Sequence, residues 1–334
     1  MIGTKRLAAL AAAAVFAVAA CSGSAASTVP SKAPSAAPPA SVAPATVAPS
    51  VAAEKIKLGL ITKFPVDFYD IMVASVKLWA KDHPEVEVLY ASGKSGSDDE
   101  GEIAAVESFI SQGVKGIAIT PTSPALQTEL QKAVDAGIKV VLIDNDIPDW
   151  KGKSSVVATD NLQGGKLAGT WLAANLKPGG KMAVLQGRLG VPALDDRVTG
   201  MLQTLGTAAT VVAKAPTDCD ETKGLDAATD MLTANPDITS IYGACGPPIL
   251  GAEKAIANAK IAPGVITVVG FDASPGEVKA ILAGTQAASV AQFPTKMGSL
   301  GIQTTLDAVL GKTVPPLVDT GTEMVTKDNA NKFQ

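Results

Sequence analysis

Short apolar runs that end abruptly on polar residues recur along this chain, and they constrain its fold more than any other feature. The clearest one begins at Ile138, just after a glycine, and ends on Asp144, Asn145 and Asp146. A run of this length is typical of a buried parallel strand. Its last residues would then lie at the carboxyl edge of a sheet, where open α/β folds bind their ligands.

The same pattern repeats from Lys55 onward, with helix-like segments between the runs. Strands are expected over 56–61, 86–90, 116–120, 138–143, 156–159, 181–185, 210–215, 238–242, 265–269 and 288–292. Helices are expected over 70–80, 98–112, 123–137, 162–176, 192–205, 225–234, 248–259, 275–283 and 294–310. This alternation predicts an α/β protein of right-handed βαβ units and mostly parallel sheets. So many units favour two doubly wound parallel-sheet lobes, and a closed (β/α)8 barrel is the alternative.

The first 21 residues have the pattern of a signal peptide rather than of a folded element. Lys5 and Arg6 precede an apolar run from Leu7 to Ala20 that is too short for a confident membrane span. The segment Val-Ala-Ala-Cys (18–21) resembles a lipoprotein box, in which the cysteine is lipidated and becomes the new N-terminus. We therefore expect Cys21 to carry a lipid, with an ordinary cleaved signal peptide as the alternative.

A segment of Ala, Pro, Ser, Thr and Val with almost no charge follows over 22–53. It lacks the apolar residues that a core requires, so a disordered tether is expected there. A lipid anchor followed by such a tether predicts a domain held at the outer face of the cell membrane. The net charge of -4 argues against nucleic-acid binding, which requires a basic surface.

Polar and aromatic side chains that could contact a ligand follow nearly every expected strand. They include Asp67, Phe68 and Tyr69 after the first strand and Asp144 and Asn145 after the fourth, followed later by Arg197, Asp218, Cys219, Asp220, Cys245, Asp272 and Gln292. Carboxylates and amides exchange hydrogen bonds with hydroxyl groups, and aromatic faces cover C–H surfaces. The set predicts a neutral, polyhydroxylated ligand, since a strongly anionic one would need more basic groups than Arg197.

Several motifs give the chain a resemblance to a known family. They are Ala-Thr-Asp-Asn-Leu-Gln-Gly-Gly-Lys-Leu-Ala-Gly (158–169), Leu-Gln-Gly (185–187) with Arg197 to Gly200 downstream, Val-Val-Gly-Phe-Asp (268–272) and Ala-Gln-Phe-Pro (291–294). From Ile56 to the C-terminus the chain resembles the periplasmic sugar-binding proteins of the ribose- and galactose-binding type, which serve ABC importers. The resemblance implies two lobes, a hinge of three segments and a ligand clamped between the lobes.

The resemblance also assigns roles to individual residues. It places Phe68 and Tyr69 on the aromatic residues that sandwich the sugar, and Asp67 near a polar ligand contact of the galactose type. It places Asp144, Arg197, Asp272 and Gln292 on hydroxyl-binding positions. It puts the lobe crossings at 160–161, 292–293 and near 316–319, so the lobes would be 54–159 plus 293–316 and 160–292 plus 317–334.

Three positions depart from the ribose type and bear on the ligand. Asn145 stands where an arginine is expected, Cys245 where an asparagine is expected, and Cys219 where an aromatic residue is expected. Both cysteines thus align with the pocket wall. They also follow consecutive strands of one lobe, and neighbouring parallel strands lie within disulfide reach. We expect a Cys219–Cys245 disulfide, with two buried free thiols as the alternative, and a pentose, hexose or sugar alcohol other than ribose as ligand.

Enzyme functions find little support in the sequence. The one histidine, His83, lies between a helix and a strand, which argues against a Ser–His–Asp triad or a multi-histidine zinc site. No phosphate-binding glycine motif is complete, so neither a cofactor nor a metal is expected. Asp144 and Asp146 could form the acid/base pair of a sugar-processing enzyme, and Trp150 could stand at the pocket mouth.

The prediction is therefore a monomeric, lipid-anchored, extracytoplasmic substrate-binding protein that delivers a neutral sugar or polyol to an ABC permease. It would contact the membrane only through its lipid. A receptor domain that signals to a membrane kinase would have the same fold and pocket, and it remains an alternative.

Overall fold

The computed structural model describes residues 54–333. The expected signal peptide over 1–21, the lipidated Cys21 and the tether over 22–53 lie outside these residues. Within the described part, no helix has both the length and the apolar character needed to cross a membrane.

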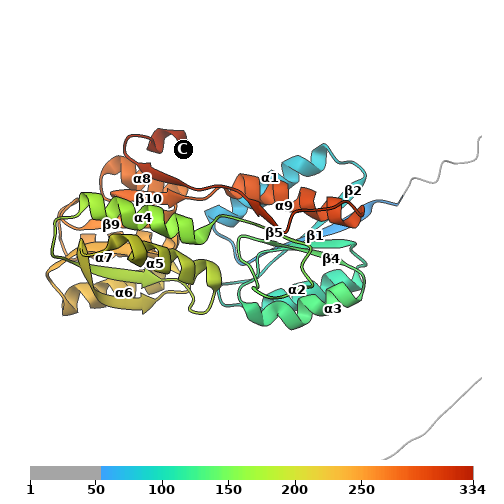
Figure 1. Ribbon diagram of the computed structural model, residues 1–334, viewed down its shortest axis with the longest axis horizontal. Coiled ribbons are helices and arrows are strands. Elements are labelled where there is room, and N and C mark those ends of the chain that lie inside the picture. The colour runs from blue at the N-terminus through green and yellow to red at the C-terminus, as the bar shows by residue number, and fades with distance from the viewer. Residues whose placement is uncertain (1–53, 334) are drawn as a thin grey trace, which may run out of the picture. The chain divides into compact units, whose positions relative to one another are not determined.

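The described residues form two six-stranded sheets rather than a closed barrel, so the two-lobe prediction is confirmed (Figure 1). The first sheet has the order β11-β5-β4-β3-β1-β2 and all its pairings are parallel. Its strands are β1 (Ile56–Thr62), β2 (Val86–Ser92), β3 (Gly116–Ile119), β4 (Lys139–Ile143), β5 (Ser155–Ala158) and β11 (Leu317–Asp319). We call this sheet and its helices the first lobe.

The second sheet has the order β12-β10-β9-β8-β6-β7, and only β12 runs antiparallel to its neighbour. Its strands are β6 (Gly180–Gln186), β7 (Ala209–Pro216), β8 (Ile238–Gly243), β9 (Thr267–Asp272), β10 (Ala288–Ala291) and β12 (Glu323–Thr326). We call this sheet and its helices the second lobe.

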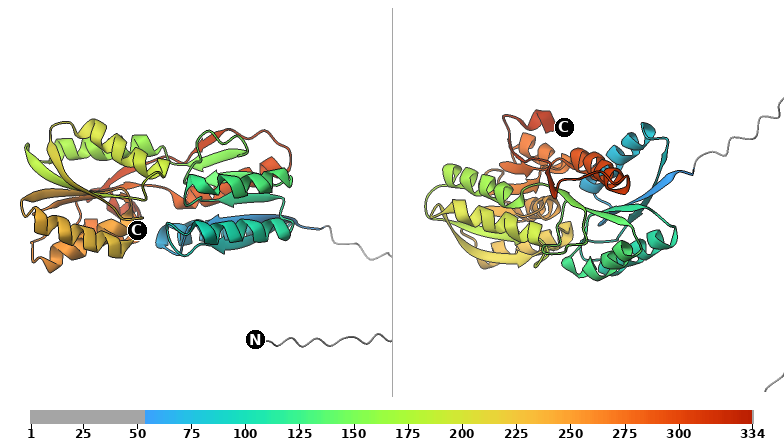
Figure 2. Two further views of the ribbon diagram at one scale, coloured as in Figure 1. Left: turned by 90° about the horizontal axis from the view of Figure 1, so that it is seen from below. Right: turned by 45° about the vertical axis from the view of Figure 1, so that its right-hand side comes forward.

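Helices cover both faces of each sheet, as doubly wound folds require (Figure 2). The first lobe contains α1 (Asp67–Lys81), α2 (Asp99–Ser111), η1 (Pro124–Leu126), α3 (Gln127–Asp135) and α9 (Pro294–Val309). The second contains α4 (Asn161–Asn175), α5 (Pro192–Leu205), α6 (Glu221–Ala234), α7 (Gly246–Asn258), α8 (Pro275–Ala283) and η2 (Ala330–Phe333). Each sheet therefore has an apolar cluster on either side, and nearly every residue of β3, β4 and β8 is buried.

The chain passes three times between the lobes. The first two passages, near Asp160 and after Gln292, lie where the sequence analysis expected them, since β5 belongs to the first sheet and α9 follows β10. The third comes later than expected, because Leu317–Asp319 pairs with β5 in the first sheet. Placing residues 317–319 in the second lobe was therefore wrong, and the passage falls between Asp319 and Glu323.

Candidate functional site

A cavity of about 260 Å³ lies between the two lobes and is lined by residues from both. Its volume is below the roughly 300–1,000 Å³ typical of pockets for drug-sized molecules, which fits a ligand of monosaccharide size. The binding residues expected from the sequence are all brought together in its lining: Asp67, Phe68, Tyr69, Asp144, Asn145, Arg197, Cys245, Asp272 and Gln292.

The aromatic part of the cavity comes from the start of α1. This helix begins at Asp67, three residues before its expected start, so Asp67, Phe68 and Tyr69 form its first turn. The rings of Phe68 and Tyr69 meet edge to face with centroids 5.2 Å apart, and Phe64 meets Tyr69 in the same way at 5.5 Å. The first lobe thus supplies an aromatic wall held rigid by ring-to-ring packing.

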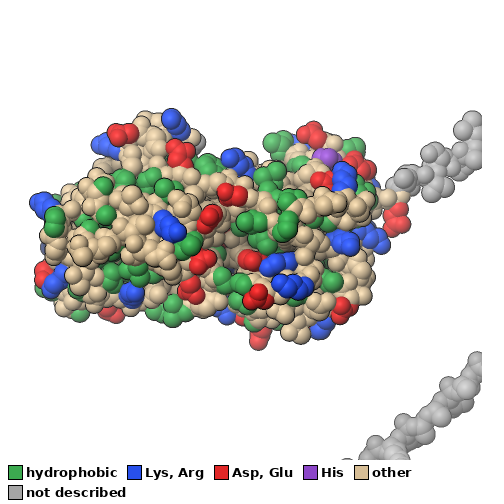
Figure 3. Space-filling view, viewed as in Figure 1, with side chains coloured by type: hydrophobic (Ala, Val, Ile, Leu, Met, Phe, Trp, Pro, Cys, Tyr) green, Lys and Arg blue, Asp and Glu red, His purple; other side chains and the backbone are tan. Residues whose placement is uncertain are grey.

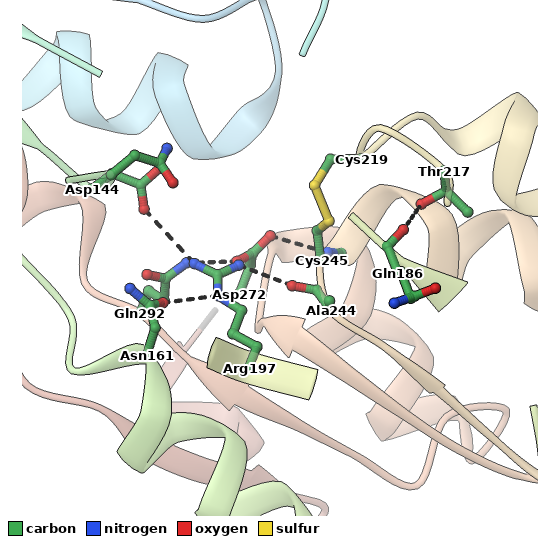
Figure 4. Close-up of a disulfide and its surroundings, with 12 residues drawn as sticks. Asp144, Asn161, Gln186, Arg197, Thr217, Cys219, Ala244, Cys245, Asp272 and Gln292 are labelled. Carbon is green, nitrogen blue, oxygen red and sulfur yellow. Dashed lines mark hydrogen bonds and ion pairs between the residues drawn. A yellow bond between two sulfur atoms is a disulfide. The ribbon is translucent and has the colours of Figure 1, made fainter. Parts of the chain in front are cut away.

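Arg197, in α5 of the second lobe, is the centre of the polar part (Figure 4). Only 3% of its side chain is exposed, and its guanidinium lies 4.0 Å from the centre of the Phe271 ring. Nε donates to Asn161 Oδ1 over 2.8 Å, and Nη1 donates to the carbonyl of Ala244 over 2.9 Å. These contacts fix the guanidinium plane before any ligand arrives.

Two carboxylates flank this guanidinium, one from each lobe. Asp272 Oδ1, at the end of β9, lies 3.4 Å from Nη1, and Asp144 Oδ1, directly after β4, lies 3.8 Å from Nη2. Asp272 also accepts hydrogen bonds from Gln292 Nε2 over 2.7 Å and from the backbone N–H of Gly246 over 3.0 Å. Burial raises the pKa of Asp272, although Arg197 and these hydrogen bonds oppose the shift.

Three acceptor oxygens at the cavity are buried without a hydrogen-bond partner among residues 54–333. They are Oδ1 of Asp144, Oδ1 of Asn145 and Oε1 of Gln292. The other acceptor of Asp144, Oδ2, receives hydrogen bonds from Tyr69 Oη over 3.2 Å and from Asn145 Nδ2 over 3.1 Å. Since a buried acceptor without a donor is costly, the cavity is built for a ligand that donates several hydrogen bonds.

Lys63 is a cavity residue that the sequence analysis missed. It follows β1 directly, lines the cavity and is 5% exposed. Burial lowers the pKa of its ammonium, while the nearby carboxylates of Asp144 and Glu102 oppose that shift. No hydrogen bond joins its Nζ to another described residue, so it can donate to a ligand oxygen. For the other strands, residues that directly follow an apolar run were expected at the carboxyl edge of the sheet. The same rule applied to the first strand would have identified Lys63.

Arg188 is a second missed cation, in the glycine-rich turn between Gly187 and Gly190. The cavity lining therefore contains Lys63, Arg188 and Arg197 against the carboxylates of Asp67, Asp144, Asp218, Glu221 and Asp272. On the face shown in Figure 3, acidic side chains also gather where the two lobes meet. Carboxylates outnumber cations even with the two additions, which supports a neutral ligand over an anionic one.

Cys219 and Cys245 form the expected disulfide, with Cα atoms 5.7 Å apart, and both line the cavity (Figure 4). The prediction is confirmed, but part of its reasoning was wrong. Strands β7 and β8 are not neighbours, because β6 lies between them. The loop after β7 instead folds over the end of β6, where the backbone N–H and Oγ1 of Thr217 both donate to the carbonyl of Gln186 over 2.9 and 2.6 Å.

Several residues at the cavity have a backbone conformation that is rare outside glycine. Asp144, Asp218, Cys219 and Asp272 have positive φ angles of 65°, 51°, 57° and 100°. Such conformations carry a local cost and persist only where surrounding contacts enforce them. Here the sharp turns direct side chains from the strand ends into the space between the lobes.

The expected place of Trp150 at the pocket mouth is wrong. Trp150 is not at the cavity mouth, since it is 4% exposed, packs in the core of the first lobe and donates from Nε1 to Gln131 Oε1. Within residues 54–333, no group of three or more His, Cys, Asp and Glu residues is placed to hold a metal ion.

A buried glutamate lies behind Asp272 in the second lobe. Glu277, in the first turn of α8, is fully buried and accepts hydrogen bonds from Ser274, Gln286 and Ser289. Burial, helped by the charge of Asp272, raises its pKa to about 8. The raised pKa favours the protonated form of Glu277 in the folded protein at neutral pH, and the hydrogen bonds of its carboxyl support the turn that presents Asp272.

This pKa predicts a specific pH dependence of stability. Between about pH 4.5 and about pH 8, Glu277 is ionised in the unfolded chain but protonated in the folded one, so stability falls as the pH rises through this window. The expected slope is on the order of 1 kcal/mol per pH unit. Urea unfolding at a series of pH values measures it. Glu277→Gln should reduce the slope without abolishing it, because burial also raises the pKa values of Glu102 and Glu253 to about 7. An identical pH profile in that variant would contradict the assignment.

Comparisons with known proteins agree with this geometry. The model of the family described as "Periplasmic binding protein domain" matches residues 58–313. The ribose import binding protein RbsB of Escherichia coli (strain K12) is 33% identical over 229 residues, which cover 68% of this chain and 76% of that protein. The D-ribose/D-allose-binding protein of Pseudomonas aeruginosa is 31% identical over 286 residues, covering 82% and 89%.

Among solved structures, a carbohydrate transporter solute-binding protein from Agrobacterium radiobacter in complex with D-arabinose superimposes with a TM-score of 0.78. It is 30% identical and covers 83% of this chain and 96% of its own. These relatives are transport proteins that bind substrates, in line with the expectation that the chain is not an enzyme.

Proposed function

Because this chain belongs to the periplasmic binding protein family, we propose that it is the lipid-anchored binding protein of an ABC importer for a neutral monosaccharide or sugar alcohol. Its relatives are named for ribose and allose, and the solved structure from Agrobacterium radiobacter is in complex with D-arabinose. The observation that carries the proposal is the meeting of Arg197 and Asp272 with Asp144 across the lobes, beside three acceptor oxygens that lack donors. Hydroxyl groups of a sugar supply those donors.

The mechanism that we propose is hinge closure around the ligand. Asp144 and the aromatic residues of α1 belong to the first lobe, whereas Arg197 and Asp272 belong to the second. A ligand that contacts both sets stabilises the closed arrangement and shifts the equilibrium between open and closed lobes. The closed form is then recognised by a permease, while Cys21 and the segment over 22–53 keep the monomer near the membrane.

Ligand identity follows from a screen of the mature domain by thermal unfolding. D-ribose, D-allose, D-arabinose, ribitol, xylitol and myo-inositol are suitable probes, with glutamate and phosphate as charged comparisons. A ligand at about 100 times its Kd stabilises the folded state by about 2.7 kcal/mol, so at least one sugar or polyol should raise the Tm by several degrees. A response to the charged compounds alone would overturn the proposal.

Lys63 gives a sharper prediction about the same site. Lys63→Met keeps an unbranched side chain that is one atom shorter and removes the ammonium donor, so affinity for the best sugar of the screen should fall about tenfold. Stability without ligand should be unchanged or higher, because burial already disfavours the charge. Calorimetric titration measures the affinity. Lys94→Met, at an exposed lysine outside the cavity, is the matched control, and equal affinities of the two variants would exclude Lys63 from the site.

A further inference from the structure

An ion pair joins the two lobes beside the cavity. Arg188, in the turn after β6 of the second lobe, donates from Nη1 to Asp99 Oδ1 over 2.7 Å and from Nη2 to Asp99 Oδ2 over 2.9 Å. Asp99 is the first residue of α2 in the first lobe. The side chains of Arg188 and Asp99 are only 25% and 24% exposed. This two-pronged geometry is the strongest form of an arginine–carboxylate contact.

The carboxylate of Asp99 is held in place by its own lobe. Thr122 Oγ1 donates to Oδ1 over 2.7 Å, and Ser123 Oγ lies 3.2 and 3.1 Å from the two oxygens. Partial burial pushes the pKa of Asp99 upward, but the hydrogen bonds from Arg188 and Thr122 outweigh it, so the pKa lies below its usual value. Because the hydroxyl groups of Thr122 and Ser123 already orient the carboxylate, Asp99 loses little freedom when it pairs with Arg188.

The lobes also make backbone contact near this pair. A Cβ atom at Gly96, in the first lobe, would lie 2.5 Å from the backbone oxygen of Asp218, in the second lobe. The nearest atom of the first lobe is Phe64 Cε1, at 3.4 Å. Gly96 therefore permits an approach of the lobes that any larger residue would obstruct, while the first lobe itself has room for a Cβ there.

We propose that the Arg188–Asp99 pair is a latch that stabilises the closed lobes independently of the ligand. Arg188 borders the cavity, yet both of its terminal nitrogens are occupied by Asp99. The latch thus increases the population of the closed state without contributing to ligand selection. It therefore raises the affinity for every ligand of the site by the same factor. This goes beyond the proposed function, because the latch acts on lobe closure whether or not a sugar is present.

Solution scattering of residues 54–334 without ligand tests the latch directly. Asp99→Asn and Arg188→Gln should each shift the equilibrium toward open lobes about fivefold and increase the radius of gyration. The double variant should resemble either single variant, because both remove the same pair. Raising the NaCl concentration should move the wild-type protein in the same direction, since salt screens a partly exposed ion pair.

The matched control is Asp307→Asn, which removes the same charge but breaks the Lys312–Asp307 pair inside the first lobe. Its radius of gyration should equal that of the wild type. Gly96→Ala should open the lobes by steric conflict with Asp218, and it reports independently on whether the closed contact forms. Equal radii for the wild type, Asp99→Asn and Arg188→Gln would overturn the latch. Failure of every sugar to bind would leave the scattering result intact and count only against the proposed function.

Discussion

Asp272→Ala is expected to abolish sugar binding, with a loss of affinity of about a hundredfold or more. Asp272 faces Arg197 over 3.4 Å and accepts from Gln292 and Gly246, so its removal leaves a guanidinium that is 3% exposed with one carboxylate fewer. Gln292 would then be free to turn away from the cavity. Calorimetric titration with the best sugar of the thermal screen measures the loss.

Asp226→Ala is a suitable control, because Asp226 is an exposed residue of α6 outside the cavity. Its affinity should match that of the wild type. Asp272→Asn keeps the shape of the side chain and should bind with an intermediate affinity, so the prediction stays testable even if Asp272→Ala unfolds. A dissociation constant of Asp272→Asn equal to the wild-type value would remove Asp272 from the binding site.

Removal of the disulfide is expected to have the second large effect. Cys219 and Cys245 close a loop with a sequence separation of 26 residues, and the chain-entropy relation gives about 3.5 kcal/mol of stability for such a loop. The double variant Cys219→Ser, Cys245→Ser should therefore show a lower urea midpoint. Since both residues line the cavity, its affinity for sugar should also fall.

Reducing agent provides the control for the disulfide prediction. Reduction of the wild-type protein should lower its urea midpoint toward that of the double serine variant, whose own midpoint should not respond. The same midpoint in oxidised wild type and serine variant would mean that the bridge does not stabilise the fold.

The secondary structure could be predicted largely from local patterns, and the errors have physical causes. Helices α5 and α8 begin at Pro192 and Pro275 as expected, since proline at the first helical position marks a start. Helices α1 and α6 begin earlier than expected, at Asp67 and Glu221. The first turn of α6 is polar, so apolar periodicity does not reveal it. In α1, Phe68 and Tyr69 were assigned to ligand contacts after the first strand and not to the helix.

Contacts between distant strands were beyond the reach of sequence patterns. The order of strands in the second sheet separates β7 from β8, and the short strand β11 pairs with β5 from far along the chain. Both depend on how whole layers pack. The disulfide was still predicted correctly. Although β7 and β8 are not adjacent, the loop after β7 folds back over the end of β6 and brings Cys219 next to Cys245.

The candidate site divides in the same way. Asp144 and Asp272 were found because each ends an apolar strand, and strand ends are visible in the sequence. Arg188 was missed because its role depends on Asp99, a residue of the other lobe that is far away in the chain. The sequence shows which residues lie at the carboxyl ends of strands. Which residues of the two lobes face each other becomes visible only in the folded structure.

The most direct test of the central claim is a crystal structure of the mature domain with the sugar or polyol that the thermal screen identifies. We expect one ligand molecule between the lobes, with its hydroxyl groups within hydrogen-bonding distance of Asp144, Arg197 and Asp272. Its C–H surface should lie against Phe68. Ligand density elsewhere on the protein, with the space around Arg197 filled only by water, would contradict the account.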